Sequence, residues 1–159
     1  MKRLVLYILI GLLLTACSSK LQPEEHLGEI YSLALDQVLV HSENLIDNLQ
    51  YIALDMSNLE ELSTSDREEI IDFFQTKYDI EVMDATLEQL LEQGLYSSDT
   101  ATLHGILLML EEVEIMQNGN VQLIGSSYRS GHAGKGVEVT ISYKDEAWRV
   151  IDHQAIWTS

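Results

Sequence analysis

The segment from Ser127 to Gly136 (SYRSGHAGKG) holds the residue types that most suggest a ligand site. It combines three glycines with arginine, histidine and lysine, in a chain with 26 acidic residues and only 9 lysines and arginines. Glycines let backbone amides approach a ligand, and a basic side chain can hold an anion. A hairpin connection whose glycines adopt positive φ angles is the alternative. The candidate ligand or partner residues are Tyr128, Arg129, Ser130, Gly131, His132, Lys135 and, further along, Trp148.

Other groups that could carry catalysis or bind a metal show no recognisable spacing. The segment lacks the Gly-Lys-Ser/Thr of a phosphate-binding loop and the GxSxG of a serine hydrolase. His132 and His153 could meet if the last two strands pair, but no HExxH sequence occurs. The sequence therefore predicts no catalytic residue, no metal and no cofactor. The histidines, none of them four residues from another, are His26, His41, His104, His132 and His153.

Cys17 is the only cysteine, so the chain cannot form an internal disulfide. Lys2 and Arg3 precede an apolar run over 4–14 (LVLYILIGLLL). A membrane-spanning helix needs roughly 20 such residues, so this shorter run fits the apolar part of a secretory signal better. Leu14, three residues before Cys17, is larger than the small residue an ordinary signal-peptidase site prefers.

Leu14-Thr15-Ala16-Cys17 resembles the lipobox of bacterial lipoproteins. The resemblance implies cleavage before Cys17 and a diacylglyceryl group on its sulfur, with residues 1–16 as signal peptide and 17–24 as lipidated tether. Two or more acyl chains give stable anchoring, whereas one gives marginal binding. The expected location is the cell membrane, lipid-anchored on the extracytoplasmic face. A plain secretion signal and an uncleaved N-terminal anchor are the alternatives.

The composition predicts one folded acidic domain over 25–159. Apolar residues make up 46% of the 159 residues, enough for one core and too few for two ordinary domains. The formal net charge of −17 disfavours nucleic acid and anionic lipid headgroups as partners.

Helical periodicity dominates the first half of this domain. Apolar residues recur at steps of three, four or seven from Tyr31 to Met56, which predicts one long helix over about 24–56, or alternatively a coiled coil. Ser65 and Glu68 have capping-box spacing and predict a second helix that begins at Ser65. A third helix is predicted over about 86–93, with Asp84 as its cap and Gly94 after its end.

The second half alternates apolar and polar residues, which predicts strands. The first covers about 106–116 with an irregularity near Glu111, and Asn118-Gly119 forms the turn to the next. Strands over about 137–143 and from Trp148 onward complete an antiparallel meander of about four strands. Helices followed by a meander predict an α+β domain whose helices cover one face of the sheet. We expect Trp148 and Trp157 in the core or packed on the sheet.

The order of helices and strands and the closing hairpin over 143–150 resemble small NTF2-like and cystatin-like lipoproteins of Gram-positive bacteria. More narrowly, Tyr128-Arg129-Ser130-Gly131 with Gly136 resembles a family of uncharacterised lipoproteins from bacilli, over roughly 84–157. The resemblance implies fold and location but no activity. We expect a non-enzymatic interaction or accessory domain with an extracytoplasmic protein partner. The alternatives are a small-ligand pocket between helices and sheet, lined by Tyr128, Arg129 and Trp148, and a transporter's binding protein.

Overall fold

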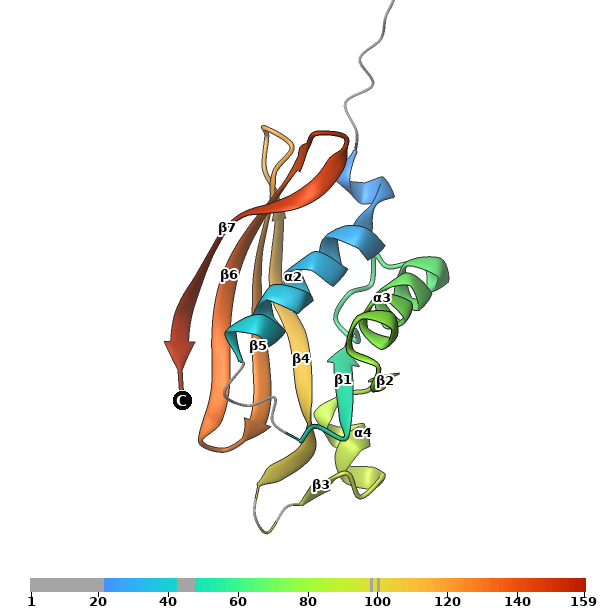
Figure 1. The fold of residues 1–159 in the computed structure, drawn as a ribbon, viewed down its shortest axis with the longest axis vertical. Coiled ribbons are helices and arrows are strands. Elements are labelled where there is room, and N and C mark those ends of the chain that lie inside the picture. Colours follow the sequence, from blue (N-terminus) through green and yellow to red (C-terminus); the bar gives the residue numbers. More distant parts are fainter. Residues whose placement is uncertain (1–21, 43–47, 98, 100) are drawn as a thin grey trace, which may run out of the picture.

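A seven-stranded mixed sheet organises the domain (Figure 1). The computed structural model describes residues 22–42, 48–97, 99 and 101–159, so the predicted signal peptide and Cys17 lie outside the described residues. The predicted α+β class is confirmed. The elements, in chain order, are η2 (Pro23–Glu25), α2 (Leu27–His41), β1 (Tyr51–Asp55), α3 (Thr64–Tyr78), β2 (Glu81–Asp84), α4 (Leu87–Glu92), β3 (Tyr96–Ser97), β4 (Thr102–Ile115), β5 (Val121–Ser130), β6 (Ala133–Lys144) and β7 (Ala147–Thr158).

The strand order is β2-β1-β4-β5-β6-β7, and β3 pairs with the beginning of β4. Strands β4 to β7 pair antiparallel in sequence order. Strand β1 is parallel to both β2 and β4, and α3 provides the crossover from β1 to β2. The sheet has seven strands where the sequence predicted about four, because the short strands β1 to β3 extend the meander at one side.

Helices α2 and α3 cover one face of the sheet, and the main core lies beneath them (Figure 1). Val38 of α2 is fully buried in the same cluster as Leu123 and Val139 of the sheet. Between the helices, the buried carboxylate of Asp36 accepts hydrogen bonds from Lys77 at 2.6 Å and 2.7 Å and from the Tyr78 hydroxyl at 2.7 Å. Burial and this carboxylate raise the pKa of Tyr78, so its hydroxyl stays protonated.

A smaller core lies on the opposite face of the sheet. Tyr51, Ala53 and Leu107 point to this side, where Leu90 of α4 packs against them. Their neighbours Ile52 and Leu108 belong to the core under α2 and α3. Strand β1 and the adjoining part of β4 are therefore covered on both faces.

The single long helix predicted over 24–56 is wrong. Helix α2 ends at His41, where the Ser42 hydroxyl donates to the Val38 carbonyl at 2.8 Å, and the chain forms β1 ten residues after that end. Tyr51 to Leu54 are buried without a break. A strand buried on both faces has a continuous apolar run, and such a run also fits steps of three and four, so periodicity alone could not separate the two structures.

Helix α3 begins at Thr64, one residue before the predicted start, and its N-cap lies two residues before the predicted one. Its N-cap is Ser63, whose hydroxyl accepts from the Asp66 amide at 3.1 Å, while Asp66 accepts from the Ser63 amide at 2.9 Å. This pair forms the capping box, in place of the predicted Ser65 and Glu68. The side-chain hydrogen bond from Ser63 lowers the pKa of Asp66.

The remaining turns and helix ends agree with the prediction except at the start of α4. The N-cap of α4 is Thr86, in a capping box with Gln89, and not Asp84 as predicted. Gly94 has the positive φ of +72° expected after that helix. The register of β4 shifts between Leu110 and Glu112, which confirms the irregularity, and Gly119 turns with φ +84°.

The described part of the chain begins next to η2. Pro23, the first residue of η2, is buried against the domain, although it falls within the predicted tether. We call this end, with η2 and the β4–β5 and β6–β7 turns, the tether pole, and the end with the β5–β6 turn and β3 the distal pole (Figure 1).

Candidate functional site

The candidate residues predicted from the sequence do not form one site. Tyr128 to Lys135 lie around the β5–β6 turn at the distal pole, whereas Trp148 begins β7 at the tether pole (Figure 1). Along β6, Tyr128 pairs with Gly134 and Trp148 pairs with Tyr143, a spacing of nine residues. At about 3.3 Å per residue the two side chains are separated by about 30 Å. This separation contradicts a pocket lined jointly by Tyr128, Arg129 and Trp148.

The space between the helices and the sheet is filled by side chains of the core. Val38, Leu123, Val137 and Ile141 are all 0% exposed there. Trp148 is itself a core residue, as predicted, 4% exposed and with its ring 6.0 Å from that of His26. The middle of the helix–sheet interface is therefore closed, while hollows open at its margins, one beside Leu27, Tyr31 and Val113 and one beside Leu39, Ile52 and Tyr78.

The glycines of the Ser127–Gly136 segment accommodate a tryptophan. Most of the segment is strand, and Gly136 pairs with Trp157 of β7. A Cβ atom at Gly136 would overlap the Trp157 indole, and one at Gly134 would lie 3.4 Å from the same ring. Neither glycine has a positive φ angle. The segment thus forms a hairpin between β5 and β6, but the positive φ angles predicted for its glycines are wrong.

The basic and aromatic residues of this segment make structural contacts. Lys135 Nζ donates to the His41 carbonyl at 2.5 Å, at the C-terminus of α2, where a positive charge is favourable. The Tyr128 hydroxyl lies 3.4 Å from that of Tyr96, and this hydrogen bond, helped by burial, raises the pKa of Tyr128 to about 12. Gly131 and His132 form the turn between β5 and β6, where both are exposed.

The structure brings together a histidine pair that the sequence did not predict. His41 Nε2 and His153 Nδ1 are 2.8 Å apart, joining the end of α2 to β7. The predicted meeting of His132 and His153 is wrong, because His153 pairs with Val139, well inside β6. Among residues 22–42, 48–97, 99 and 101–159, no three His, Cys, Asp or Glu side chains gather in a way that could hold a metal ion.

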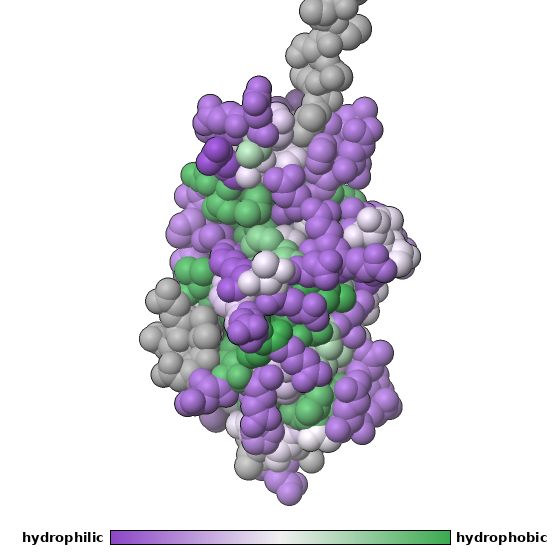
Figure 2. Space-filling view, turned by 45° about the vertical axis from the view of Figure 1, so that its right-hand side comes forward, coloured by the Kyte–Doolittle hydropathy of each residue, from purple (hydrophilic) through white to green (hydrophobic). Residues whose placement is uncertain are grey.

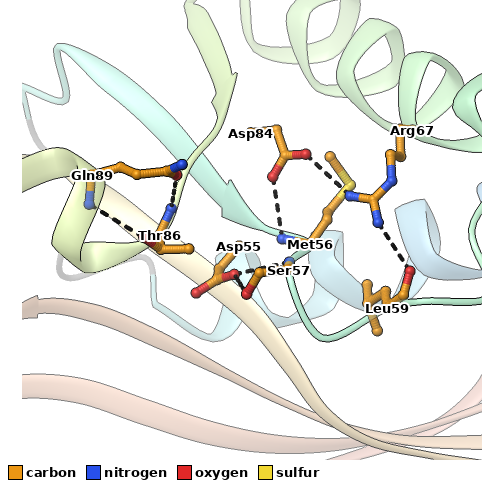
Figure 3. A network of polar contacts seen from close by, with 8 residues as sticks. All are labelled: Asp55, Met56, Ser57, Leu59, Arg67, Asp84, Thr86 and Gln89. Atoms are coloured by element: carbon orange, nitrogen blue, oxygen red, sulfur yellow. Dashed lines mark hydrogen bonds and ion pairs between the residues drawn. The ribbon is translucent and has the colours of Figure 1, made fainter.

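A polar network surrounds the carboxyl ends of the parallel strands β1 and β2 (Figure 3). Arg67 donates to Asp84 Oδ2 at 3.1 Å and to the Leu59 carbonyl at 3.0 Å, and Asp84 Oδ1 accepts from the Met56 amide at 3.4 Å. Ligands of α/β proteins often bind at this edge of a sheet, so the network is a natural place to look for chemistry.

The carboxylates of this network bind their own loop. Asp55 accepts from the Ser57 amide at 3.0 Å and from the Ser57 hydroxyl at 2.6 Å (Figure 3). Together with the Arg67 contacts, these bonds fix the chain between β1 and α3. The arrangement therefore explains the loop's conformation and requires no ligand.

Two hollows open on the surface near β4. One, of about 420 Å³, lies beside η2, and the Tyr31 hydroxyl donates to Glu61 at 2.5 Å in its wall. Burial is the main reason that the pKa of Tyr31 is raised, so its hydroxyl remains a donor. The other, of about 280 Å³, is lined by Glu112, Val113, Glu114, Gln122, Ile124 and Glu138.

The second hollow belongs to what we call the open face, the side of β4 to β7 that points away from α2. Two rows of paired residues cross it: Glu112, Ile124, Glu138 and Gln154, then Glu114, Gln122, Thr140 and Asp152. Five further residues separate this face from the covered part: Met109, Glu111, Ser126, Gly136 and Trp157. The open face is therefore mainly acidic and uncharged polar.

Strand β7 is the least covered element of the domain. All eight residues over 151–158 are exposed, including Ile151 at 41%, Ile156 at 42% and Trp157 at 43%. On the face drawn in Figure 2, by contrast, hydrophobic residues form separate patches between hydrophilic ones. The candidate functional surface is therefore β7 with the adjoining open face.

Comparisons with protein-family models, with curated proteins and with solved structures found no match. In the part of the chain that the structure describes, no helix is long and apolar enough to cross a membrane.

Proposed function

We propose that this protein is a lipoprotein held on the extracytoplasmic face of the cell membrane through Cys17, and that its domain binds another protein without catalysing a reaction. The observation that carries the proposal is Leu14-Thr15-Ala16-Cys17 after a short apolar run, with the buried Pro23 only six residues beyond Cys17. A lipid on Cys17 would thus lie close to the tether pole.

The distribution of polar and apolar groups supports a binding role for the domain. The charged groups of the Arg67 network and of the Asp36 cluster bond to neighbouring parts of the same chain. Three large exposed apolar side chains, those of Ile151, Ile156 and Trp157, lie along one strand, and exposed apolar groups are common where proteins bind other proteins.

We also propose an NTF2-like or cystatin-like relationship for this domain. Its support is the packing of one helix, α2, across the long antiparallel strands β4 to β7. Strands β1 to β3 are an addition that the resemblance did not imply.

The intact mass of the protein purified from membranes tests the lipid assignment. We expect a polypeptide that begins at Cys17 and carries added acyl mass, and a Cys17→Ala variant that leaves the membrane fraction or accumulates unprocessed. A Ser18→Ala variant, changed next to the same site, should be processed and located like the parent protein. A polypeptide beginning at residue 17 without added mass would refute the assignment.

A further inference from the structure

The outer edge of β7 is the feature from which the inference starts. Among the strands of the described residues, β7 lies at one end of the sheet and pairs with β6 alone (Figure 1). A strand in this position presents a row of backbone donors and acceptors to which another strand can pair. Natural proteins usually protect such edges with lysines, prolines, bulges or a covering loop.

The protection of β7 is incomplete. Its register against β6 shifts twice, leaving Ile151 and Ile156 as the additional residues of two bulges. Bulges bend an edge away from partners, but here both bulge residues are apolar and about two-fifths exposed. Between them, residues 152–155 pair with β6 in regular register. A regular, exposed segment between two isoleucines is better suited to binding another strand than to preventing such pairing.

The acidic side chains near this edge favour a basic partner. Asp152 lies on the open face, and the neighbouring Glu138 accepts a hydrogen bond from Gln154 at 2.9 Å. Glu112 continues the same row two strands away. A segment added to β7 would place every second side chain on the same face as these carboxylates, with Asp152 as its direct neighbour.

We propose that β7 accepts an extended basic segment of a partner protein as an eighth strand of the sheet. The proposal rests on the proposed function, since it takes the domain to be a binding module. Backbone hydrogen bonds to β7 would supply affinity, and the residues between the basic ones would follow the opposite side of the sheet. Lysines or arginines at alternate positions would lie next to Asp152 and in the field of Glu138 one strand further in. Trp157, packed over Gly136, gives the end of this edge an apolar contact.

A second copy of the chain is the competing occupant, and charge disfavours it. Each copy carries a formal net charge of −17, so two copies joined edge to edge would bring like-charged sheets side by side. A basic segment gains attraction from the same field.

The test measures binding of a short peptide of alternating lysine and valine to the full chain purified from membranes. Its control is the same peptide N-methylated at every backbone amide, which keeps the charge and removes the donors. We expect the unmodified peptide to bind at least about tenfold more tightly, with slower amide hydrogen exchange in β7. Equal affinities, or protection elsewhere in the domain with none in β7, would overturn the proposal.

Two matched substitutions locate the binding. Ile156→Lys adds a positive charge to the β7 edge, whereas Ile115→Lys makes the same change at a residue of similar exposure, 39% against 42%, at the tether pole. We expect Ile156→Lys to weaken peptide binding about fivefold or more and Ile115→Lys to leave it nearly unchanged. Circular dichroism checks that both variants fold, and Ile151→Lys replaces Ile156→Lys if that one does not.

The remaining outcomes separate this proposal from the lipoprotein assignment. A dimer of the unliganded chain in sedimentation, dissociated by Ile156→Lys, would assign the edge to a second copy and refute the basic segment. Acyl mass on a chain that does not bind the peptide refutes only the edge proposal. Peptide binding by a chain without acyl mass refutes only the lipid assignment.

Discussion

The two ends of the sheet are covered very differently. Tyr51 to Leu54 in β1 have core on both sides, under α2 and α3 on one face and under α4 on the other. Residues 151–158 of β7 are exposed throughout. Apolar area removed from water supplies most of the favourable free energy of folding, at about 25 cal/mol per Å². The β1 end should therefore stabilise the fold, while the β7 end can gain or lose a partner without unfolding it.

The largest expected effect compares the same substitution at the two ends. Ile52 is 1% exposed in β1 and Ile156 is 42% exposed in β7. Ile52→Ala should lower the free energy of unfolding by about 3 kcal/mol through lost burial and a cavity. Ile156→Ala should lower it by less than about 0.5 kcal/mol. Urea denaturation measures both changes. Equal losses of unfolding free energy would show that the two ends of the sheet do not differ in their contribution to stability.

A smaller loss is expected from the contact between α2 and α3. Tyr78→Phe removes one of the hydrogen bonds to the buried Asp36 carboxylate and should cost about 2 kcal/mol, since bonds to charged groups are stronger than neutral ones. Tyr143→Phe, at a hydroxyl-bearing ring that is 41% exposed, is the control and should change stability little. Comparable urea midpoints for the two variants would count against a structural role for the Asp36 cluster.

The contact between the Trp157 indole and Gly136 of β6 predicts a smaller loss of stability. Gly136→Ala should displace the indole and cost about 1.5 kcal/mol by overpacking, with a shift of the Trp157 emission to longer wavelength. At Gly131 an added Cβ would meet its nearest atom at 3.9 Å, so Gly131→Ala should leave the emission unchanged. Unaltered fluorescence in Gly136→Ala would show that the glycine serves another purpose.

The smallest effect concerns the N-cap of α3. This helix covers the sheet only at the end that contains β1. Ser63→Ala should cost about 1 kcal/mol near neutral pH. Because the pKa of Asp66 is lowered in the native state, that state binds fewer protons than the unfolded one. The associated stability is present above about pH 4 and is lost as pH falls through the native pKa. Ser63→Ala should therefore make the free energy of unfolding fall less steeply with decreasing pH below about pH 4. An unchanged pH dependence would exclude a link between this cap and the pKa of Asp66.

Local patterns predicted the meander well and the β1 end poorly. Alternating residues, Asn118-Gly119 and the irregularity at Glu111 are short-range signals, and each appears where expected. Tyr51 to Leu54 carry a continuous apolar run, whose partners lie more than 25 residues away in β2 and β4. Only knowledge of those partners distinguishes a strand from a helix there.

The candidate site was predicted in part. Counting residues outward from each hairpin turn places Trp148 opposite Tyr143 and Tyr128 near Gly134. The distance between Tyr128 and Trp148 could therefore have been found from the sequence. The contact of Trp157 with Gly136 depends on a register shift that the sequence did not reveal. The pairing of His41 with His153 joins residues 112 positions apart and needs the whole fold.

The direction of β7 has a mechanical consequence. The strand runs from the tether pole to the distal pole (Figure 1), so tension between a lipid on Cys17 and a partner segment held along β7 would act parallel to the strands. Hydrogen bonds of an antiparallel pair lie perpendicular to the strands, so the β6–β7 bonds would carry such a pull together and not break one after another. In this geometry β7 resists sliding along β6 through all of the hydrogen bonds between the two strands at once.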